Sequence, residues 1–449
     1  MTRPTLIKNA RIASEDGIIE GDVLIRAGHI ERVGRGGEGA GPAEVFDARG
    51  RLLLPGMIDD QVHFREPGLT HKGTIASESR AAVAGGITSF MEMPNTTPPT
   101  VTLQALEDKY ARAAEHSAAN YAFYLGATND NLDVIRALPH GAACGIKVFM
   151  GSSTGNMLVD DVRTLSGIFR EANTVIATHC ESTPRIERRL KQALEKYGEE
   201  IPVTEHSWIR DIQACLESSR IAVELAREHR AQLHVLHLST AAEMALFETG
   251  PIEEKSITGE VCVHFLYFTS EDYPRFGNKI KCNPSIKSPD NRVALLAALA
   301  EGRIDILATD HAPHTAEEKA ETKYLAAPAG LPLVQDALLC ALELVHRGFL
   351  SLERVVALTS HNVARRFGVT ERGFIREGYW ADLVLVDPQQ PTRVTPERVL
   401  YKCGWTPFEG EQFSSSIAAT WVNGVLAWDG ERLIEHGAAR RLQFSPPGR

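Results

Sequence analysis

The sequence predicts an α/β protein, a (β/α)8 TIM barrel with a small β-sandwich domain formed by the N- and C-terminal segments. Two observations indicate the barrel. Short apolar strands alternate with amphipathic helical segments through the middle of the 449-residue chain, and eight such strands are present, as this barrel requires. A third observation indicates the sandwich, because both ends of the chain carry strand-like segments separated by turns.

The two ends of the chain have the same strand-rich character. TLIKNARIAS, GDVLIRAG and HIERVGRG place apolar residues near every second position. Towards the C-terminus, ADLVLVDP is typical of a buried strand, and SIAATWVNGVLAWDGERL predicts a hairpin that turns at Asn423-Gly424. We therefore expect residues 1–52 and 371–449 to build the β-sandwich, and residues 53–370 to form the barrel.

Eight apolar segments are the expected barrel strands: MIDDQVHF, ITSFMEM, YAFYLGA, GIKVFM, TVIATHC, LHVLHLS, ITGEVCV and IDILATD. Helical periodicity lies between several of them, in LQALEDKYARAAEHSA, RIERRLKQALEKYG, QACLESSRIAVELAREH and NRVALLAALAEG. A doubly wound open sheet is the alternative architecture. It is disfavoured because no GxGxxG motif follows an early strand.

Composition narrows the classes of function. The formal net charge is −10 and no segment is dense in Lys and Arg, which argues against a nucleic-acid partner. No apolar run reaches the ~20 residues of a membrane span, and MTRPTLIKNARIAS lacks the apolar core of a signal peptide. The seven cysteines are scattered without a CxxC motif, so we expect a cytoplasmic protein without disulfides or a cysteine-based zinc site.

Polar residues follow the predicted strands at the end where such barrels place their active sites. In PGMIDDQVHFREPG, alternation predicts that four side chains share one face: Asp59, Gln61, His63 and Arg65. Later strand ends supply Asn95, Lys147, His179, His237 and Asp310, with His311 and His314 close behind.

Taken singly, these residues have ordinary explanations, since a lone strand histidine is usually a hydrogen-bonded core residue and Lys147 alone predicts a buried ion pair. Together they indicate a metal site, because four different strands end in a group that can bind metal. A protonated ammonium cannot coordinate, but Lys147 in a low-dielectric site can lose its proton and react with CO2. The resulting carbamate is a two-oxygen anion able to bridge two cations.

The chain resembles a cyclic amidohydrolase of the amidohydrolase superfamily, and most of all a class I dihydroorotase. The segments that carry the resemblance are PGMIDDQVHFREPG, AGGITSFMEMPNT, GIKVFM, ATHCE, LHVLHLST, KCNPSIKS, ILATDHAPHT, REGYWADLVLVDP and KCGWTPFEG. The family signature is His-x-His on strand one, a carboxylated Lys on strand four, His on strands five and six, and Asp on strand eight.

The resemblance implies a zinc-dependent hydrolase that interconverts dihydroorotate and N-carbamoyl-aspartate in pyrimidine biosynthesis. His63 and Asp310 would belong to a first zinc, His179 and His237 to a second, and carboxylated Lys147 would bridge them. Zinc lowers the pKa of bound water to about 7. Asp310 would take the proton of the nucleophile and pass it to the departing amide nitrogen.

Substrate recognition is implied for a separate set of residues. Arg65, Asn95 and Asn283 match the positions by which dihydroorotases hold the ring and its carboxylate, and His314 matches a further substrate contact. A guanidinium suits a carboxylate because it can donate two parallel hydrogen bonds. We expect a small-molecule substrate, no nucleic-acid or membrane partner, and a homo-oligomer.

Two of these residues have other possible roles. Arg65 can instead form a structural ion pair with Glu66 or Asp59, and Asn95 can be a turn residue before Pro98-Pro99. Among the other histidines, we expect His234 to point away from His237 and pack against a helix, and His311 to support its loop. The loop at 315–330 either closes over the substrate or is a plain surface loop.

Gln61 departs from the family pattern, because it stands where the first histidine of His-x-His is expected. A neutral amide oxygen is a much poorer zinc ligand than an imidazole. Three outcomes follow: one tightly held zinc at the second position, two zincs with the first weakened or replaced, or a non-catalytic subunit that binds a partner such as a carbamoyltransferase. We favour a working hydrolase, because a decayed site loses several groups together. An allantoinase or hydantoinase type of cyclic amidohydrolase is the other enzymatic alternative.

Overall fold

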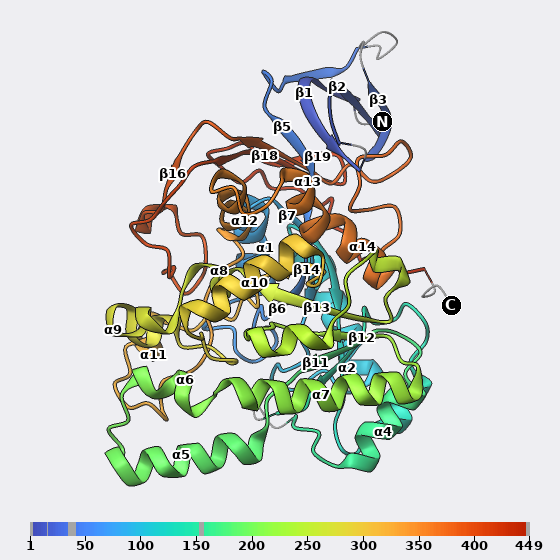
Figure 1. The fold of residues 1–449 in the computed structure, drawn as a ribbon. Coiled ribbons are helices and arrows are strands. Elements are labelled where there is room, and N and C mark those ends of the chain that lie inside the picture. The colour runs from blue at the N-terminus through green and yellow to red at the C-terminus, as the bar shows by residue number, and fades with distance from the viewer. Residues whose placement is uncertain (1–2, 16, 35–41, 152–156, 446–449) are drawn as a thin grey trace.

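The computed structural model describes residues 3–15, 17–34, 42–151 and 157–445 (Figure 1). A β-rich layer built from both ends of the chain lies on one side of a larger barrel, at the top of Figure 1. This arrangement confirms the predicted fold class, while the domain boundaries after residues 52 and 370 stay a prediction.

The β-rich layer is one eight-stranded sheet with strand order β19-β18-β15-β5-β1-β2-β3, and β4 pairs with β1. Its strands are β1 Thr5–Ser14, β2 Gly17–Arg26, β3 His29–Gly34, β4 Glu44–Asp47, β5 Leu52–Pro55, β15 Leu383–Asp387, β18 Ser416–Val422 and β19 Val425–Trp428. The hairpin between β18 and β19 turns at Asn423 and Gly424, both with positive φ as an Asn-Gly turn requires. The sequence therefore predicted this turn correctly.

The central strands of this sheet are apolar on both faces because both faces are covered. In β15, Leu383 and Leu385 belong to the core of the sheet's own layer, whereas Val384 and Val386 belong to the core shared with the barrel. A strand covered on both faces has a continuous apolar run rather than an alternating pattern. The run LVLV thus fixes the sheet against the barrel.

The barrel contains the eight predicted strands in sequence order. They are β6 Met57–Val62, β7 Ile87–Glu92, β8 Asn120–Phe123 with its continuation β9 Leu125–Gly126, β10 Ile146–Phe149, β11 Ile176–His179, β12 Leu233–Val235, β13 Ile257–Cys262 and β14 Ile306–Ala308. All paired neighbours are parallel. The circle closes where Val62 bridges His311 and the His63 N–H donates to the His311 carbonyl oxygen over 2.7 Å.

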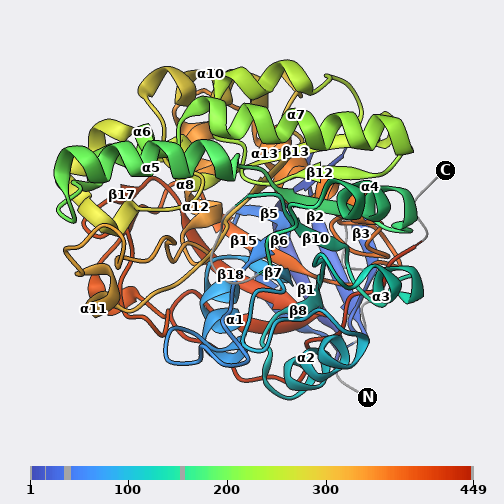
Figure 2. The same cartoon turned by 90° about the horizontal axis from the view of Figure 1, so that it is seen from below.

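Helices surround these strands, as Figure 2 shows from below. Their bounds are α1 Ile75–Ala84, α2 Leu103–His116, α3 Leu132–Ala137, α4 Val162–Glu171, α5 Thr183–Tyr197, α6 His206–Ile209, α7 Ile212–His229, α8 Val263–Tyr267, α9 Tyr273–Phe276, α10 Pro289–Glu301, α11 Ala316–Lys319, α12 Ala337–His346, α13 Leu352–Val356 and α14 Asn362–Phe367. Two of the long helices begin at side-chain caps: Thr102 accepts from the Ala105 N–H before α2, and Asp211 accepts from the Ala214 N–H before α7.

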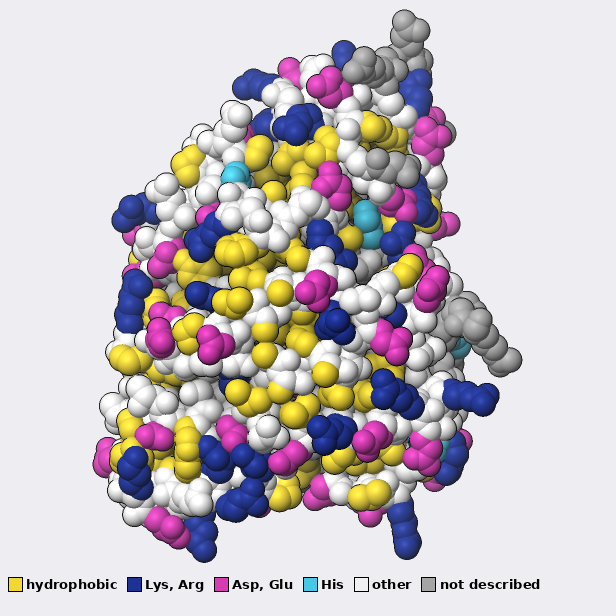
Figure 3. Space-filling view, in the orientation of Figure 1, with side chains coloured by type: hydrophobic (Ala, Val, Ile, Leu, Met, Phe, Trp, Pro, Cys, Tyr) yellow, Lys and Arg dark blue, Asp and Glu magenta, His cyan; other side chains and the backbone are white. Residues whose placement is uncertain are grey.

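The outer surface mixes charges of both signs. On the face drawn in Figure 3, basic and acidic side chains are interspersed over the helices, with apolar side chains between them. The two strands β16 Thr392–Arg393 and β17 Gln412–Phe413 form a small separate sheet. Within the described ranges, no helix has both the length and the apolar character to span a bilayer.

Candidate active site

The C-terminal ends of the barrel strands surround one polar pocket. Its lining includes seven of the nine residues that the sequence proposed for the site, together with Gln61, Phe149 and the loop residues Ala312, Ala329 and Gly330; the seven are His63, Arg65, Lys147, His179, His237, Asn283 and Asp310. Asn95 and His314 are not part of this lining, and each instead contacts a residue that is. The structure thus brings together groups distant along the chain, such as Gln61 and Asp310, which are 249 positions apart.

Three of the pocket residues adopt positive φ: Arg65 (71°), His237 (41°) and Asp310 (52°). Each follows the end of its strand, and none is glycine, so these conformations cost free energy that the surroundings must offset. The turn therefore points the side chain in a different direction from the one that strand alternation predicts. Strand periodicity alone therefore does not predict where these side chains point.

The same irregularity corrects one expectation for the first strand. Asp59 does not share the pocket with Gln61, because its carboxylate accepts from the Thr309 hydroxyl over 2.6 Å and from the Thr309 N–H. The pairing of β6 with β7 shifts register between Asp59 and Val62, so the period of two is broken there. Burial raises the pKa of Asp59 to about 8.

His179 and His237 form what we call the second half-site. Nδ1 of His179 lies 2.9 Å from Nε2 of His237, and the two side chains are almost fully buried. Two nitrogen ligands on a tetrahedral zinc are ~3.3 Å apart, given Zn–N distances of about 2.0–2.1 Å. Burial lowers the pKa of both imidazoles, which keeps them neutral and able to coordinate.

A carboxylate supports the second half-site from behind. Nε2 of His179 lies 3.1 Å from Glu181, and Arg210 pairs with that carboxylate. Burial by itself would raise the pKa of Glu181, but Arg210 and His179 hold it at about 2. An imidazole whose second nitrogen meets a carboxylate is typical of metal ligands, so the surroundings of His179 fit a zinc ion.

His63 and Asp310 form the first half-site. Nε2 of His63 lies 3.1 Å from Oδ1 of Asp310, and Nδ1 of His63 lies 2.8 Å from the amide oxygen of Asn95. Asn95 thus fixes the ring that the sequence assigned to metal binding. Burial lowers the pKa of His63, so this imidazole also stays neutral.

Gln61 contacts the first half-site directly. Its amide nitrogen donates to the same Oδ1 of Asp310 over 3.1 Å, and its amide oxygen lies 3.8 Å from the Cys262 sulfur, which donates to it. A glutamine can give this carboxylate a hydrogen bond but is a weak ligand for zinc. The first half-site therefore has one imidazole where the second has two.

Lys147 belongs to β10, between the strands that carry the other ligands. Its side chain is almost fully buried, and Nζ lies 4.6 Å from the centroid of the Phe149 ring. Burial lowers the pKa of Lys147 to about 8, which leaves a fraction of neutral amine near neutral pH. The donor set of two neutral imidazoles, a third imidazole, a carboxylate and this amine fits one or two zinc ions.

Arg65 lies beside the first half-site with its guanidinium turned into the pocket. Nε donates to the Pro313 carbonyl oxygen over 3.0 Å. Among the described residues, no carboxylate lies within 4.0 Å of this guanidinium, because Glu66 accepts from the Ile75 N–H and Asp59 bonds Thr309. The alternative role as an ion pair with Glu66 or Asp59 is therefore wrong.

The neighbour of Arg65 is His314, whose tautomer follows from its contacts. Nδ1 lies 3.0 Å from the Lys72 ammonium and must accept from it, so Nε2 carries the proton and donates to the Ala329 carbonyl oxygen over 3.0 Å. Burial, Arg65 and Lys72 lower the pKa of His314. Nη2 of Arg65, 3.1 Å from the protonated Nε2, therefore gains no acceptor from His314.

The loop at 315–330 forms one wall of the pocket and is tied down. Lys319 is buried, and its ammonium donates to three carbonyl oxygens, those of Lys281, Pro328 and Gly330, over 2.9–3.1 Å. In the same pocket, the amide oxygen of Asn283 is buried without a hydrogen-bond partner among the described residues. An N–H group of a ligand can bond to that oxygen.

A second polar cluster lies deeper inside the barrel. Nε2 of His234 is 3.2 Å from both Asp60 and Glu260, and all three side chains are buried. Their ligand atoms lie within 4.8 Å of one another, so this group is a further candidate for a metal ion. Glu260 also accepts from the His237 N–H over 3.1 Å, which links the cluster to the second half-site.

His234 does contact a helix, since its ring lies 5.7 Å from the Phe367 ring of α14, but it points into the barrel interior. Asp60 lies on β6, across the barrel from β12, so His234 reaches it only through the barrel interior. Strand β12 ends at Val235 and the chain turns at His237, which invalidates the face assignment made by counting residues. Despite burial, Asp60 and Glu260 raise the pKa of His234 to about 9. The sequence did carry a signal for this cluster, because charged residues stand inside the apolar runs MIDDQV and ITGEVC.

Comparison with known proteins agrees with this geometry. Residues 52–427 match the Amidohydrolase family. The dihydroorotase of Halobacterium salinarum is 36% identical over 435 residues, which cover 95% of this chain and 97% of that protein. The allantoinase of Solibacter usitatus is 32% identical over 98% of this chain and 96% of that protein.

Solved structures give the same result for the fold. The L-hydantoinase (dihydropyrimidinase) from Arthrobacter aurescens superposes with a TM-score of 0.92 at 29% identity, over 99% of this chain and 100% of that one. A dihydropyrimidinase from Brevibacillus agri NCHU1002 gives a TM-score of 0.91 at 26% identity. The resemblance drawn from the sequence motifs is confirmed.

Proposed function

This chain is a member of the amidohydrolase family, and from that premise we propose that it is a zinc-dependent dihydroorotase. The reaction is the reversible hydrolysis of the cyclic amide of dihydroorotate to N-carbamoyl-aspartate. Hydrolysis of cyclic amides is the activity common to its dihydroorotase and allantoinase relatives. The choice of dihydroorotate within this class is the proposal.

One observation carries that choice: a buried guanidinium faces the pocket without a carboxylate partner. Arg65 is 4% exposed, and burial lowers its pKa to about 10. A buried charge without a counter-ion is costly, so an anionic group on the ligand would offset the cost. Dihydroorotate carries a ring carboxylate, which a guanidinium can bind through two parallel hydrogen bonds.

Zinc would be held by His179 and His237 at the second half-site, and by His63 and Asp310 at the first. Zinc supplies a nucleophilic water with a pKa near 7 and polarises the ring carbonyl. Lys147 would join the two half-sites as a carbamate: its neutral Nζ forms a bond to the carbon of CO2 and releases one proton. The amine that burial makes available suits that addition.

The chain's own groups would move the proton and hold the ring. Oδ1 of Asp310 accepts a proton from the attacking water and returns it to the ring nitrogen as the C–N bond breaks. Gln61, whose amide N–H donates to Oδ1 over 3.1 Å, orients that carboxylate. Arg65 binds the ring carboxylate, and the unpartnered amide oxygen of Asn283 accepts a ring N–H.

The test is an assay of the purified, zinc-supplemented protein on four substrates: dihydroorotate, N-carbamoyl-aspartate, allantoin and a 5-substituted hydantoin. We expect turnover of the first two and a kcat/KM for dihydroorotate well above that for the uncharged rings. A preference for allantoin or the hydantoin would contradict the dihydroorotase proposal and support a cyclic amidohydrolase of another substrate specificity. Tight zinc binding with no turnover of any ring would instead support a non-catalytic subunit.

A further inference from the structure

We propose that Glu78 and His311 form a positioning pair that holds the first half-site in place for zinc. The proposal rests on the zinc site of the proposed function but is independent of which cyclic amide the enzyme hydrolyses. Neither side chain belongs to the pocket lining. Both are fully buried behind it, where helix α1 meets the exit of β14.

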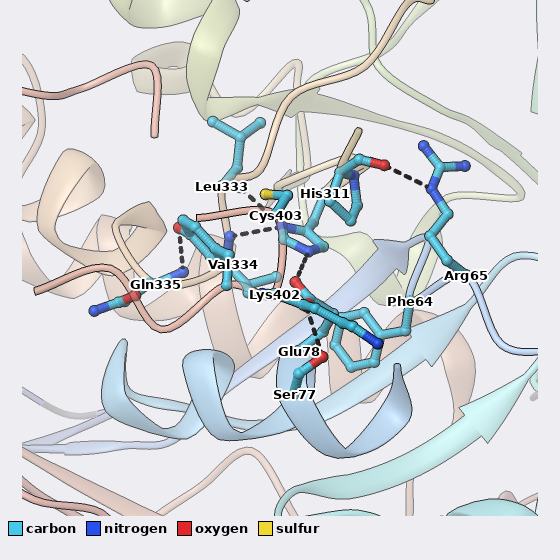
Figure 4. Close-up of polar contacts among 12 residues, drawn as sticks. Phe64, Arg65, Ser77, Glu78, His311, Leu333, Val334, Gln335, Lys402 and Cys403 are labelled. Carbon is cyan, nitrogen blue, oxygen red and sulfur yellow. Dashed lines mark hydrogen bonds and ion pairs between the residues drawn. The ribbon is translucent and has the colours of Figure 1, made fainter. Parts of the chain in front are cut away.

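The His311 ring is held on both sides (Figure 4). Nε2 lies 2.8 Å from a Glu78 carboxylate oxygen, and Nδ1 accepts from the Leu333 N–H over 2.8 Å and from the Val334 N–H over 3.3 Å. The edge of the ring meets Phe64 at 5.7 Å between centroids. The support of the loop that the sequence suggested for His311 is thus present.

These contacts leave a single protonation state for His311. Nδ1 accepts two N–H groups and therefore carries no proton, so the ring is neutral and its proton resides on Nε2. Nε2–H then donates to Glu78, which must be an acceptor. Reversing the tautomer would place N–H against the Leu333 N–H on one side, which makes the arrangement rigid.

Glu78 in turn accepts hydrogen bonds at both of its oxygens. Its second oxygen accepts from the Ser77 hydroxyl over 2.8 Å and from the Lys402 N–H over 3.1 Å. The carboxylate thus joins three separate segments: helix α1, the strand exit at His311, and the C-terminal segment that contains Lys402 (Figure 4). Rotation of Glu78 would break all of these bonds together.

The pair reaches the first half-site through the backbone of His311. Its carbonyl oxygen accepts from the His63 N–H over 2.7 Å, and its N–H donates to the Thr309 hydroxyl over 2.9 Å. Between Thr309 and His311 stands Asp310 with φ at 52°. Fixing the His311 ring therefore fixes both His63 and the strained turn that aims Asp310.

This support matters more at the first half-site than at the second. The second has two imidazoles to define its geometry, whereas the first has one imidazole and the weak ligand Gln61. Where ligands are fewer, zinc affinity depends more on the accuracy with which the remaining groups are held. The Glu78–His311 pair supplies that accuracy without touching the metal.

The experiment compares Glu78→Gln, His311→Asn and the double variant with the wild type. In Glu78→Gln, either orientation of the amide places N–H against the His311 Nε2–H or the Lys402 N–H. The matched control is Asp305→Asn, because Asp305 is a buried carboxylate near the other end of β14 that pairs with Lys255. Zinc affinity is measured by chelator competition, with kcat, KM and Tm measured alongside.

We expect each single variant to weaken the weaker class of zinc site by about 10- to 100-fold and to lower kcat with KM unchanged. The double variant should lose no more affinity than the worse single variant, because the two residues act as a unit. Asp305→Asn should lower Tm while keeping wild-type zinc affinity. Single variants that lower Tm but bind zinc as the wild type does would overturn the proposal.

If Glu78→Gln does not fold, the conservative variant Glu78→Asp tests whether the Glu78–His311 pair positions the first half-site. Glu78→Asp keeps the charge and both acceptor oxygens but shortens the side chain by one methylene. Weakened zinc binding in a folded Glu78→Asp protein would support the pair, and wild-type zinc affinity there would overturn it. A wild-type protein that binds no zinc would overturn the proposed function and the pair with it, whereas wild-type zinc affinity in the folded variants would overturn the pair alone.

Discussion

The two half-sites of the pocket differ in burial and in ligand type. His179 and His237 are 2% and 3% exposed, and the Glu181–Arg210 pair supports His179. The His63 and Asp310 side chains are each 11% exposed, and their third neighbour is the amide of Gln61. The second half-site is therefore more buried and richer in imidazole than the first, and we expect it to hold zinc more tightly.

This difference between the half-sites implies that the loss of one imidazole need not abolish hydrolysis. Under the proposed function, the groups that would move the proton and bind the ring lie at the first half-site, while two of the three imidazoles that would bind zinc lie at the second. Weaker binding of zinc at the first half-site would lower the rate of hydrolysis without abolishing hydrolysis. The variants below test this division, from the largest expected effect to the smallest.

Lys147→Ala should have the largest effect, because it removes the group proposed to join the two half-sites. We expect kcat/KM to fall by at least about 10³-fold and the weaker zinc to be lost. Metal analysis and steady-state kinetics measure both. The control is Lys255→Met, which removes another buried lysine, paired with Asp305 away from the pocket; equal losses in the two variants would contradict a specific role for Lys147.

Removing one imidazole from each half-site tests their inequality directly. His179→Asn should abolish the tight class of zinc binding, whereas His63→Asn should weaken only the loose class, by about 10- to 100-fold. Equilibrium dialysis at graded zinc concentrations separates the two results. The account fails if both substitutions reduce the same class of site.

Arg65→Gln tests the substrate side of the first half-site. A hydrogen bond to a charged group contributes about 1.5–3 kcal/mol, so the KM for dihydroorotate should rise roughly 10- to 150-fold. Hydrolysis of an uncharged cyclic amide should change little, because Arg65 would have no anion to bind there. A parallel loss on charged and uncharged rings would show that Arg65 supports the fold of the pocket instead.

Lys319→Met should have the smallest effect on catalysis, because Lys319 acts on the pocket wall and not on the ligands. Without its bonds to three carbonyl oxygens, the wall at Ala329 and Gly330 should loosen and KM should rise a few-fold, with zinc content unchanged. Limited proteolysis of the loop at 315–330 reports the loosening. Lys323→Met is the matched control, since Lys323 is an exposed lysine of the same loop paired with Glu199.

Much of this architecture was predictable because the sequence patterns are local. Eight apolar strands and the helices between them identified the barrel, and the strand ends identified Lys147, His179 and His237. A chain-order match to a family signature added the roles. These predictions needed only the positions of residues relative to the ends of strands.

The rest depended on contacts between distant segments and on irregular backbone. The ion pair of Glu181 with Arg210 joins two loops that no periodicity connects. The cluster of Asp60, His234 and Glu260 forms across the barrel interior. Positive φ at His237 breaks the alternation from which the direction of His234 was inferred. Such turns follow from tertiary contacts and leave no signal in the strand pattern.

The most direct test of unequal half-sites is a zinc-binding isotherm of the wild type beside Gln61→His. The account predicts two classes of site in the wild type, one tight and one weak. In Gln61→His, an added imidazole near Asp310 should tighten the weak class about tenfold or more and leave the tight class unchanged. Two equally tight zinc ions in the wild type, or no response of the weak class to this substitution, would contradict it.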